Sequence, residues 1–231
     1  MRVIGLTGNI AAGKSTVAAT LAGECGLAVI DCDALAHAAV RPGAWAHRRL
    51  LAAFGPAITA DPARPATAAI DREALGRLAF ADPAARRKLN AATHLPIFLA
   101  LLGCLLRAWL ACRTVVVVDM PLLFESGFWR FTHPRLLVDA PEAVRSARLQ
   151  ARDGLDAAAA ADRIAAQAPA AGKRGRCRWV IDNGGAVDAV RAAAVVVGGE
   201  MQRWAWVHWL VSPPAVVAAV TAAAGVGLWR G

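Results

Sequence analysis

The sequence predicts an α/β fold built on a parallel sheet, and three observations lead to this prediction. Five short apolar runs rich in β-branched residues recur along the 231 residues, as expected for strands that are buried on both faces. Segments with helical patterns separate these runs, which is typical of a parallel sheet with right-handed crossovers. A phosphate-binding motif also joins the first run to the first helix. We therefore expect one α/β domain with insertions.

The first strand is expected over residues 3–6, and residues 8–15 follow it with the P-loop pattern G-x-x-x-x-G-K-[ST]. A helix is predicted over residues 16–21. In such a unit, successive backbone N–H groups face a polyphosphate at the helix N-terminus. Lys14 would reach the β- and γ-phosphates, and the Ser15 hydroxyl would hold Mg²⁺. The residues expected to bind ATP here are Gly8, Asn9, Ile10, Ala11, Ala12, Gly13, Lys14, Ser15 and Thr16.

The second strand is expected over residues 27–30 and is followed by Asp31 and Asp33. Ligands of open α/β sheets bind outside the carboxyl ends of the strands. A carboxylate at this position can accept a proton from an attacking hydroxyl group. The alternative is that these two acids cap the next helix, and position alone does not choose between the two roles.

A long segment, about residues 34–112, separates the second strand from the third and is predicted to be a helical insertion. Asp82-Pro83 is a helix-start signal, and residues 59–69 form a loop rich in Pro and Ala. The expected helices cover residues 44–54, 71–80, 83–90 and 97–111. A kinase would place its acceptor-binding region in such an insertion.

The three remaining strands are expected over residues 114–118, 135–138 and 179–181. Asp119 follows four valines at the end of the third strand, where an acid faces Mg²⁺ or substrate. Residues 145–177 carry seven basic residues and form a candidate lid over a bound nucleotide. Surface solvation is the alternative role of its arginines, above all Arg145 and Arg176.

The overall charge is +9 with a pI of about 10.6, which fits anionic partners such as nucleotides, nucleic acids or membrane surfaces. The five cysteines form no C-x-x-C pair, so we expect neither structural disulfides nor a zinc site. The tryptophans gather near the C-terminus, away from most basic residues. Nucleic-acid binding would need basic and aromatic residues on one face, so no nucleic-acid partner is expected.

Several segments together resemble the dephospho-CoA kinase family, in order from about residue 1 to residue 203. Besides the P-loop with Ile4-Gly5-Leu6-Thr7 before it, they are Val29-Ile30-Asp31-Cys32-Asp33, Arg41-Pro42-Gly43, Asp71-Arg72-Glu73-Ala74-Leu75-Gly76, Asp119-Met120-Pro121-Leu122-Leu123-Phe124-Glu125, Arg148-Leu149-Gln150-Ala151-Arg152-Asp153, Arg163-Ile164-Ala165-Ala166-Gln167 and Val180-Ile181-Asp182-Asn183-Gly184-Gly185. A P-loop alone is weak support, but this ordered set is specific.

The resemblance implies a P-loop kinase with a five-stranded parallel sheet, a helical acceptor-binding insertion and a lid. Such an enzyme uses ATP with Mg²⁺ to phosphorylate the ribose 3′-hydroxyl of dephospho-CoA, which gives CoA and ADP. By this likeness the catalytic residues are Asp33 as general base, Lys14, Arg148 and Arg152. Asn183 and Gly184 would lie near the adenine. The implied acceptor-binding residues are Asp31, Arg72, His94, Asp119, Pro121, Leu122 and Glu125.

Two departures from the family pattern stand out. Asn9 replaces a usual glycine, and we expect the loop to tolerate it because Asn adopts left-handed backbone conformations better than most residues. The family's His-Pro pair is here His94-Leu95-Pro96, which should alter the local backbone. His94 is a candidate substrate contact, with helix capping or core packing as equal alternatives.

We expect a kinase domain over residues 1–203, with a nucleotide core (1–40, 113–147 and 178–203), an acceptor-binding insertion (41–112) and a lid (148–177). Residues 204–231 form a hydrophobic tail that resembles the C-terminal extension of eukaryotic family members. Tryptophans flank its uncharged stretch like membrane-interface residues, although Pro213-Pro214 interrupts it. The tail is thus a candidate membrane anchor on the cytoplasmic or organelle-surface face. The alternatives are a last helix on the core or a disordered end.

Two other functions remain open from the sequence. The first is a P-loop kinase that acts on another nucleotide-like acceptor. The second is a non-catalytic basic protein with a decayed kinase fold that binds a membrane or nucleic acid. Decay should have damaged Lys14, Ser15, Asp33 or Asp119, and all four are present.

Overall fold

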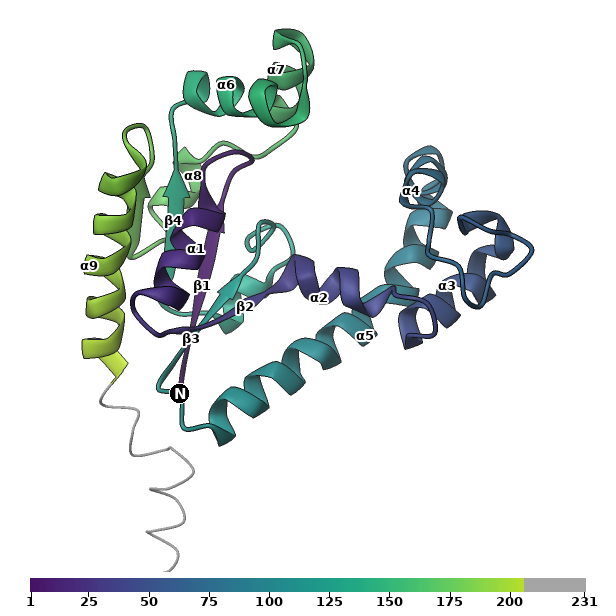
Figure 1. Cartoon of the computed structure of the whole chain (residues 1–231), viewed down its shortest axis with the longest axis horizontal. Coiled ribbons are helices and arrows are strands. Elements are labelled where there is room, and N and C mark those ends of the chain that lie inside the picture. The colour runs from purple at the N-terminus through teal and green to yellow at the C-terminus, as the bar shows by residue number, and fades with distance from the viewer. Residues whose placement is uncertain (206–231) are drawn as a thin grey trace, which may run out of the picture. The chain divides into compact units, whose positions relative to one another are not determined.

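The computed structural model describes residues 1–205 and divides the chain into two compact units. The first unit consists of Met1–Ile30 together with the chain from Arg107 onward, and the second is Asp31–Leu106. Figure 1 shows the sheet of the first unit and the helices of the second. The predicted C-terminal tail lies outside the described residues from residue 206 onward.

The five expected strands are confirmed to within two residues at each end. They are β1 (Arg2–Gly8), β2 (Ala28–Asp31), β3 (Val115–Asp119), β4 (Arg135–Asp139) and β5 (Trp179–Asp182). Their order in the sheet is β2-β3-β1-β4-β5. The pairs β1–β3, β1–β4 and β4–β5 are parallel, with Ile4 opposite Val117 and Leu6 opposite both Asp119 and Leu136.

The main hydrophobic core lies between this sheet and two helices, α1 (Lys14–Gly23) and α9 (Val187–Ala205). The side chains of Leu21 and Met201 are fully buried in it with those of the central strands. At Gly198 a Cβ atom would lie 2.5 Å from Cys25 Sγ. Close packing at this point therefore requires a glycine, and α9 closes the core beside the P-loop helix.

The predicted lid, residues 148–177, covers the second half of α6 (Glu142–Asp153) together with α7 (Ala157–Ala165) and α8 (Ala171–Arg174). Leu149 of α6 packs with Ala160 and Ile164 of α7. Ile10 and Ala11 of the P-loop pack against the same cluster. The lid helices therefore share a small apolar core with the phosphate-binding loop.

The helical unit has a core of its own, made by Leu50, Ile58, Ile70, Leu75 and Ala92. Its helices are α2 (Cys32–Ala39), α3 (Trp45–Phe54), α4 (Arg72–Ala81) and α5 (Pro83–Leu110), with a short 3-10 helix, η1 (Pro56–Ile58). A second 3-10 helix, η2 (Phe128–Phe131), belongs to the first unit.

The prediction of two separate helices over residues 83–90 and 97–111 is wrong. A single helix of 28 residues, α5, continues through the buried Pro96. Proline removes one backbone hydrogen bond inside a helix and usually ends or kinks it. Here helix-favouring residues extend for more than two turns on both sides, so the helix tolerates the loss.

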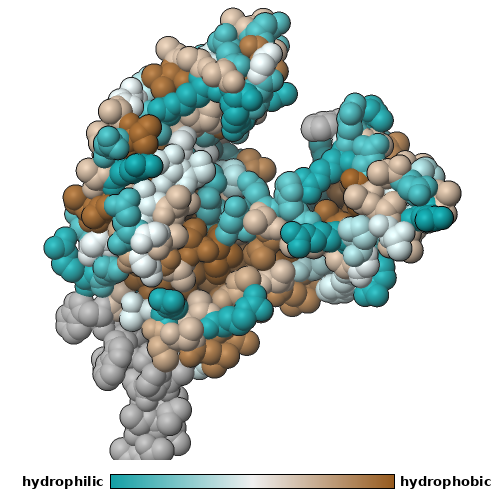
Figure 2. Space-filling view, in the orientation of Figure 1, coloured by the Kyte–Doolittle hydropathy of each residue, from teal (hydrophilic) through white to brown (hydrophobic). Residues whose placement is uncertain are grey.

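One face of α5 exposes large apolar side chains between 46% and 58%, namely those of Leu95, Phe98, Leu99, Leu102, Leu106 and Leu110. Apolar atoms along this helix are brown in Figure 2. Among the described residues, α5 is the one helix whose length and composition would allow it to cross a membrane, and core helices of soluble proteins pass the same test.

Candidate active site

The P-loop, residues 8–15, depends on two glycines for its shape. Gly13 precedes α1 with φ of 87°, a left-handed conformation. A Cβ atom would lie 1.9 Å from Asn183 Nδ2 at Gly13, and 2.6 Å from the Val138 carbonyl oxygen at Gly8. The motif glycines are therefore fixed by close packing as well as by backbone freedom.

The P-loop also contains a strained position, Ala11, which has φ of 57°. A non-glycine residue in this region costs free energy and persists only where its surroundings hold it. The reason expected for the tolerance of Asn9, its ease in a left-handed backbone, does not apply, because positive φ among the described non-glycine residues occurs at Ala11 and Cys112. Asn9 is instead buried, and its side chain bonds to the lid region.

Lys14 and Asp119 form an ion pair at the carboxyl ends of the strands. The Lys14 ammonium donates to Asp119 Oδ1, and only 18% and 7% of the two side chains are exposed. Asp119 ends β3, which lies directly beside the central strand β1, so the parallel register places it next to the P-loop. The structure thus brings the predicted phosphate-binding lysine and a predicted acceptor-side acid together.

Arg148 and Asn183 hold the opposite side of the P-loop. Arg148 Nη2 donates to Asn183 Oδ1 at 3.0 Å, and Nη1 donates to the Ala11 carbonyl at 3.4 Å. Asn183 Nδ2 donates to the Ala12 carbonyl at 2.8 Å. Two segments that are far apart in sequence therefore meet on the loop backbone, beside the position where a nucleotide would bind.

The sequence profile of the family described as dephospho-CoA kinase matches residues 2–189. The chain belongs to the dephospho-CoA kinase family. A dephospho-CoA kinase of Anaeromyxobacter dehalogenans is 44% identical over 194 residues, which is 84% of this chain and 89% of that protein. One from Oryza sativa subsp. japonica is 36% identical over 191 residues, or 83% and 80% of the two chains. The crystal structure of TT1252 from Thermus thermophilus superposes with a TM-score of 0.73 at 36% identity, covering 87% of this chain and 97% of that one.

Arg152, another predicted catalytic residue of this dephospho-CoA kinase family member, pairs with a neighbouring carboxylate. Arg152 binds both carboxylate oxygens of Asp153, at 2.7 and 3.1 Å, and its side chain is 62% exposed. The pKa of Asp153 is lowered, mainly by the hydrogen bond from Arg152. Partial desolvation of the Asp153 carboxylate raises this pKa by less, and the charge of the nearby Arg163 lowers it as well.

The surface-solvation alternative is wrong for Arg145 and holds only in part for Arg176. Arg145 is buried, and its Nε donates to the Ala140 carbonyl at 3.1 Å. Arg176 is exposed, but its guanidinium stacks on Phe124 at 4.4 Å and on Trp129 at 4.3 Å. Arg145 thus supports α6, while Arg176 covers the turn after β3.

The helical unit carries several of the predicted acceptor-side residues. Asp31 caps α2 by accepting from the Ala34 N–H at 2.9 Å, so the capping alternative is correct for this residue. Asp33 lies in the first turn of α2 with an exposed side chain. Arg72 Nη1 lies 2.7 Å from His37 Nε2. His94 is exposed within α5, so it neither caps a helix nor packs in the core.

The loop after β3 carries the last group of predicted residues. The Pro121 carbonyl accepts from the Thr7 hydroxyl at 3.0 Å, which fixes the loop beside β1. Leu122 is 56% exposed. Glu125 forms an ion pair with Lys173 at 2.9 Å. The exposed Leu122 side chain thus directly follows a residue whose backbone is hydrogen-bonded to β1.

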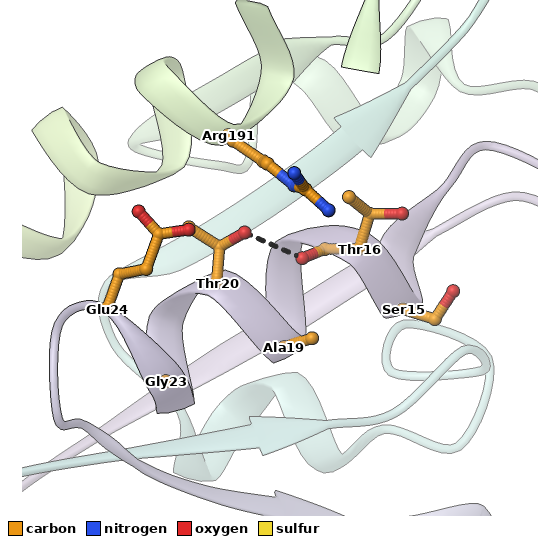
Figure 3. Close-up of a pocket in the computed structure, with 7 residues that line it drawn as sticks. All are labelled: Ser15, Thr16, Ala19, Thr20, Gly23, Glu24 and Arg191. Atoms are coloured by element: carbon orange, nitrogen blue, oxygen red, sulfur yellow. Dashed lines mark hydrogen bonds between the residues drawn. The ribbon is translucent and has the colours of Figure 1, made fainter. Parts of the chain in front are cut away.

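A cavity of about 610 Å³ runs from the P-loop helix to α9. Figure 3 shows the Arg191 side chain reaching from α9 over α1 towards Thr16. The Ser15 and Thr16 end of this cavity is continuous with the P-loop, and Glu24 marks its other end. Its volume is in the range of small-molecule sites.

Gln167 and Lys173 contact the P-loop but were not predicted as site residues. Gln167 Oε1 accepts from the Ile10 N–H at 2.7 Å, and Lys173 Nζ donates to Asn9 Oδ1 at 3.1 Å. Gln167 ends a family-like segment and Lys173 is one of seven basic residues in the lid region. The family-like segment was thus a sequence signal for Gln167, whereas no local pattern singles out Lys173.

Proposed function

We propose that this chain transfers the γ-phosphoryl group of ATP to the ribose 3′-hydroxyl of dephospho-CoA, giving CoA and ADP in the last step of coenzyme A biosynthesis. The main support for this proposal is the ion pair between Lys14 of the P-loop and Asp119. Membership of the dephospho-CoA kinase family also supports it. Phosphoryl transfer needs mainly positioning and charge neutralisation, and the site is equipped for both.

On the ATP side, the backbone N–H groups at the start of α1 would bind the phosphates. Lys14 would exchange part of its contact with Asp119 for the β- and γ-phosphates. Arg148 lies on the Ala11 carbonyl and can bring a second cation to the phosphoryl group. By the family likeness Asn183 and Gly184 would border the adenine, and Asn183 also bonds to the Ala12 carbonyl of the P-loop.

On the acceptor side, we assign Asp33 as the general base. Asp31 is committed to capping α2, whereas the Asp33 carboxylate is exposed and two residues further along. The insertion with Arg72 and His94 would hold dephospho-CoA, and the loop with Pro121, Leu122 and Glu125 would border it. Arg152 would join the site after release from Asp153.

Mg²⁺ is the proposed cofactor, and the Ser15 hydroxyl is its proposed protein ligand. Ser15 is exposed in the first turn of α1. The described residues contain no cluster of three or more His, Cys, Asp or Glu side chains that could hold a metal. Mg²⁺ keeps several waters and uses few protein ligands, so the proposed ion would arrive with the nucleotide. The bound ion would neutralise charge on the phosphates.

A coupled assay with ATP, Mg²⁺ and dephospho-CoA tests the proposal. We expect ADP release that depends on dephospho-CoA, with a product that carries a 3′-phosphate. Adenosine and other nucleotide-like acceptors serve as the comparison. Turnover with one of those acceptors but not with dephospho-CoA would replace this function by that of another P-loop kinase.

A further inference from the structure

The chain segment at the end of the lid, residues 167–173, bonds directly to the first two variable positions of the P-loop. The Ile10 N–H donates to Gln167 Oε1 at 2.7 Å. Asn9 Nδ2 donates to the Ala168 carbonyl at 3.2 Å, and Asn9 Oδ1 accepts from Lys173 Nζ at 3.1 Å. Both groups of the Asn9 side-chain amide are therefore used.

Lys173 is buried to 95% and pairs with two parts of the site at once. Its ammonium lies 3.1 Å from Asn9 Oδ1 and 2.9 Å from Glu125 Oε1. The pKa of Glu125 is lowered overall. Partial burial raises this pKa, but that effect is outweighed by the hydrogen bond and charge of Lys173 and by two backbone N–H groups. A buried ammonium needs such partners, so Lys173 is held firmly between them.

The P-loop needs this support because Ala11 is strained. Its φ of 57° is unfavourable for alanine. The preceding residues, Asn9 and Ile10, are held by the lid segment, and the following carbonyl of Ala12 is held by Asn183. Hydrogen bonds therefore fix the chain on both sides of Ala11.

We infer that Lys173 is a positioning residue, which holds the P-loop in its phosphate-binding shape through Asn9 and links that loop to the acceptor side through Glu125. The inference rests on the proposed ATP site. Lys173 acts through the backbone of the loop, and it need not touch the nucleotide. Its loss should therefore weaken ATP binding more than it lowers the rate of the chemical step.

The test combines Lys173→Met, Asn9→Ala and the double variant. Isothermal titration with Mg²⁺ and a non-hydrolysable ATP analogue gives the nucleotide affinity, and steady-state assays give the KM values and kcat. We expect about 10-fold weaker nucleotide binding in each single variant, in line with loss of a charge-assisted hydrogen bond. The loss of affinity in the double variant should be smaller than the sum of the two single losses, because both changes remove the Lys173–Asn9 bond, while Asn9→Ala also removes the bond to the Ala168 carbonyl.

Arg77→Met is the matched control, since it removes an Arg–Glu ion pair with Glu73 that is mostly exposed in α4. It should leave nucleotide affinity unchanged. Because Asn9 has no positive φ, Asn9→Ala keeps the backbone allowed and remains informative if Lys173→Met fails to fold.

The link to the acceptor side is tested separately with Glu125→Gln. This variant weakens the ion pair with Lys173 and should raise the KM for dephospho-CoA.

The inference fails if both single variants bind the analogue like the wild type, or if their effects simply add. It also fails if only the melting temperature falls. These results are distinct from failure of the proposed function, in which the wild-type protein itself would not bind the analogue or would not phosphorylate dephospho-CoA.

Discussion

At the scale of single residues, the site depends on ion pairs and hydrogen bonds between distant positions. Lys14 is held by Asp119, Arg148 by Asn183, and Lys173 by Asn9 and Glu125. Each cation has a protein partner that resembles a phosphate oxygen in chemistry. In the proposed function, Lys14 and Arg148 would exchange these oxygen acceptors for those of the nucleotide phosphates.

Lys14→Ala should lower turnover by roughly 10²-fold or more, because contacts to developing phosphoryl charge typically contribute about 3 kcal/mol to transition-state stabilisation. The variant should also melt at a lower temperature, because Asp119 loses its buried ion pair with Lys14. Lys14→Ala combined with Asp119→Asn should recover stability without recovering turnover. Near wild-type turnover in Lys14→Ala would refute the P-loop assignment.

Asp33→Asn should lower kcat by roughly 10²-fold, the usual scale for loss of a general base. The affinity for ATP should change little. Asp31→Asn serves as the control, since Asn also caps helices well and Asp31 is engaged in capping α2. If Asp33→Asn stays fully active, another acid such as Asp119 must accept the proton.

Cys177 should be unreactive at neutral pH, since burial raises the pKa of its thiol to about 11 despite the positive charges of Arg135, Arg176 and Lys173. Between the ordinary value of 9.0 and about 11, the unfolded chain would lose this proton and the folded chain would keep it. Stability should therefore fall as the pH rises through this window. Alkylation at pH 8, followed by peptide mass mapping, should label the exposed Cys112 at least about 10 times faster than Cys177.

At the scale of elements, the lid region divides into a part that is bonded to the P-loop and a part that is not. Residues 167–173 are attached through Asn9 and Ile10. Arg148 and Arg152 lie one turn apart on α6, and only Arg148 contacts the loop backbone. The lid over residues 148–177 stays a prediction, and these bonds attach its last part to the P-loop through side chains and backbone.

Arg148→Ala and Arg152→Ala should therefore differ in their kinetics. Loss of Arg148 removes its bonds to Asn183 and Ala11, so the KM for ATP should rise about 10-fold. Loss of Arg152 should mainly lower kcat, because we expect it to approach the phosphoryl group only in the closed enzyme. Steady-state kinetics with each substrate varied decide this. An effect of Arg152→Ala confined to the KM for dephospho-CoA would place Arg152 on the acceptor side.

At the scale of the whole molecule, the described chain ends in α9, whose last turn belongs to the core. Ala205 is fully buried, and Trp204 stacks on Arg2 and on Arg178, each at 4.4 Å. The catalytic and ATP-binding residues assigned above all precede this turn. A cut that tests the tail should therefore fall after Ala205 rather than before Trp204.

Deletion of residues 206–231 should leave activity in solution unchanged and abolish binding to lipid vesicles. The tryptophans and apolar residues of the tail motivate this expectation. Flotation of the full-length and truncated chains with vesicles, alongside their melting temperatures, provides the measurement. If both chains float equally, or if truncation causes aggregation, the tail is not a membrane anchor.

The sequence by itself determined the five strands, the P-loop and the family. Their signals are local: apolar runs for buried strands, glycines where a side chain cannot fit, and motifs in a fixed order. Continuity of α5 through Pro96 was not predictable from such signals, because a proline usually ends or kinks a helix and here the helix-favouring residues on both sides outweigh it. Only the tertiary structure decided which partner each charged residue has. The partners of Lys14, Arg148 and Lys173 are 35 to 164 residues away, and contacts across such separations depend on the sheet order and crossovers rather than on neighbouring residues.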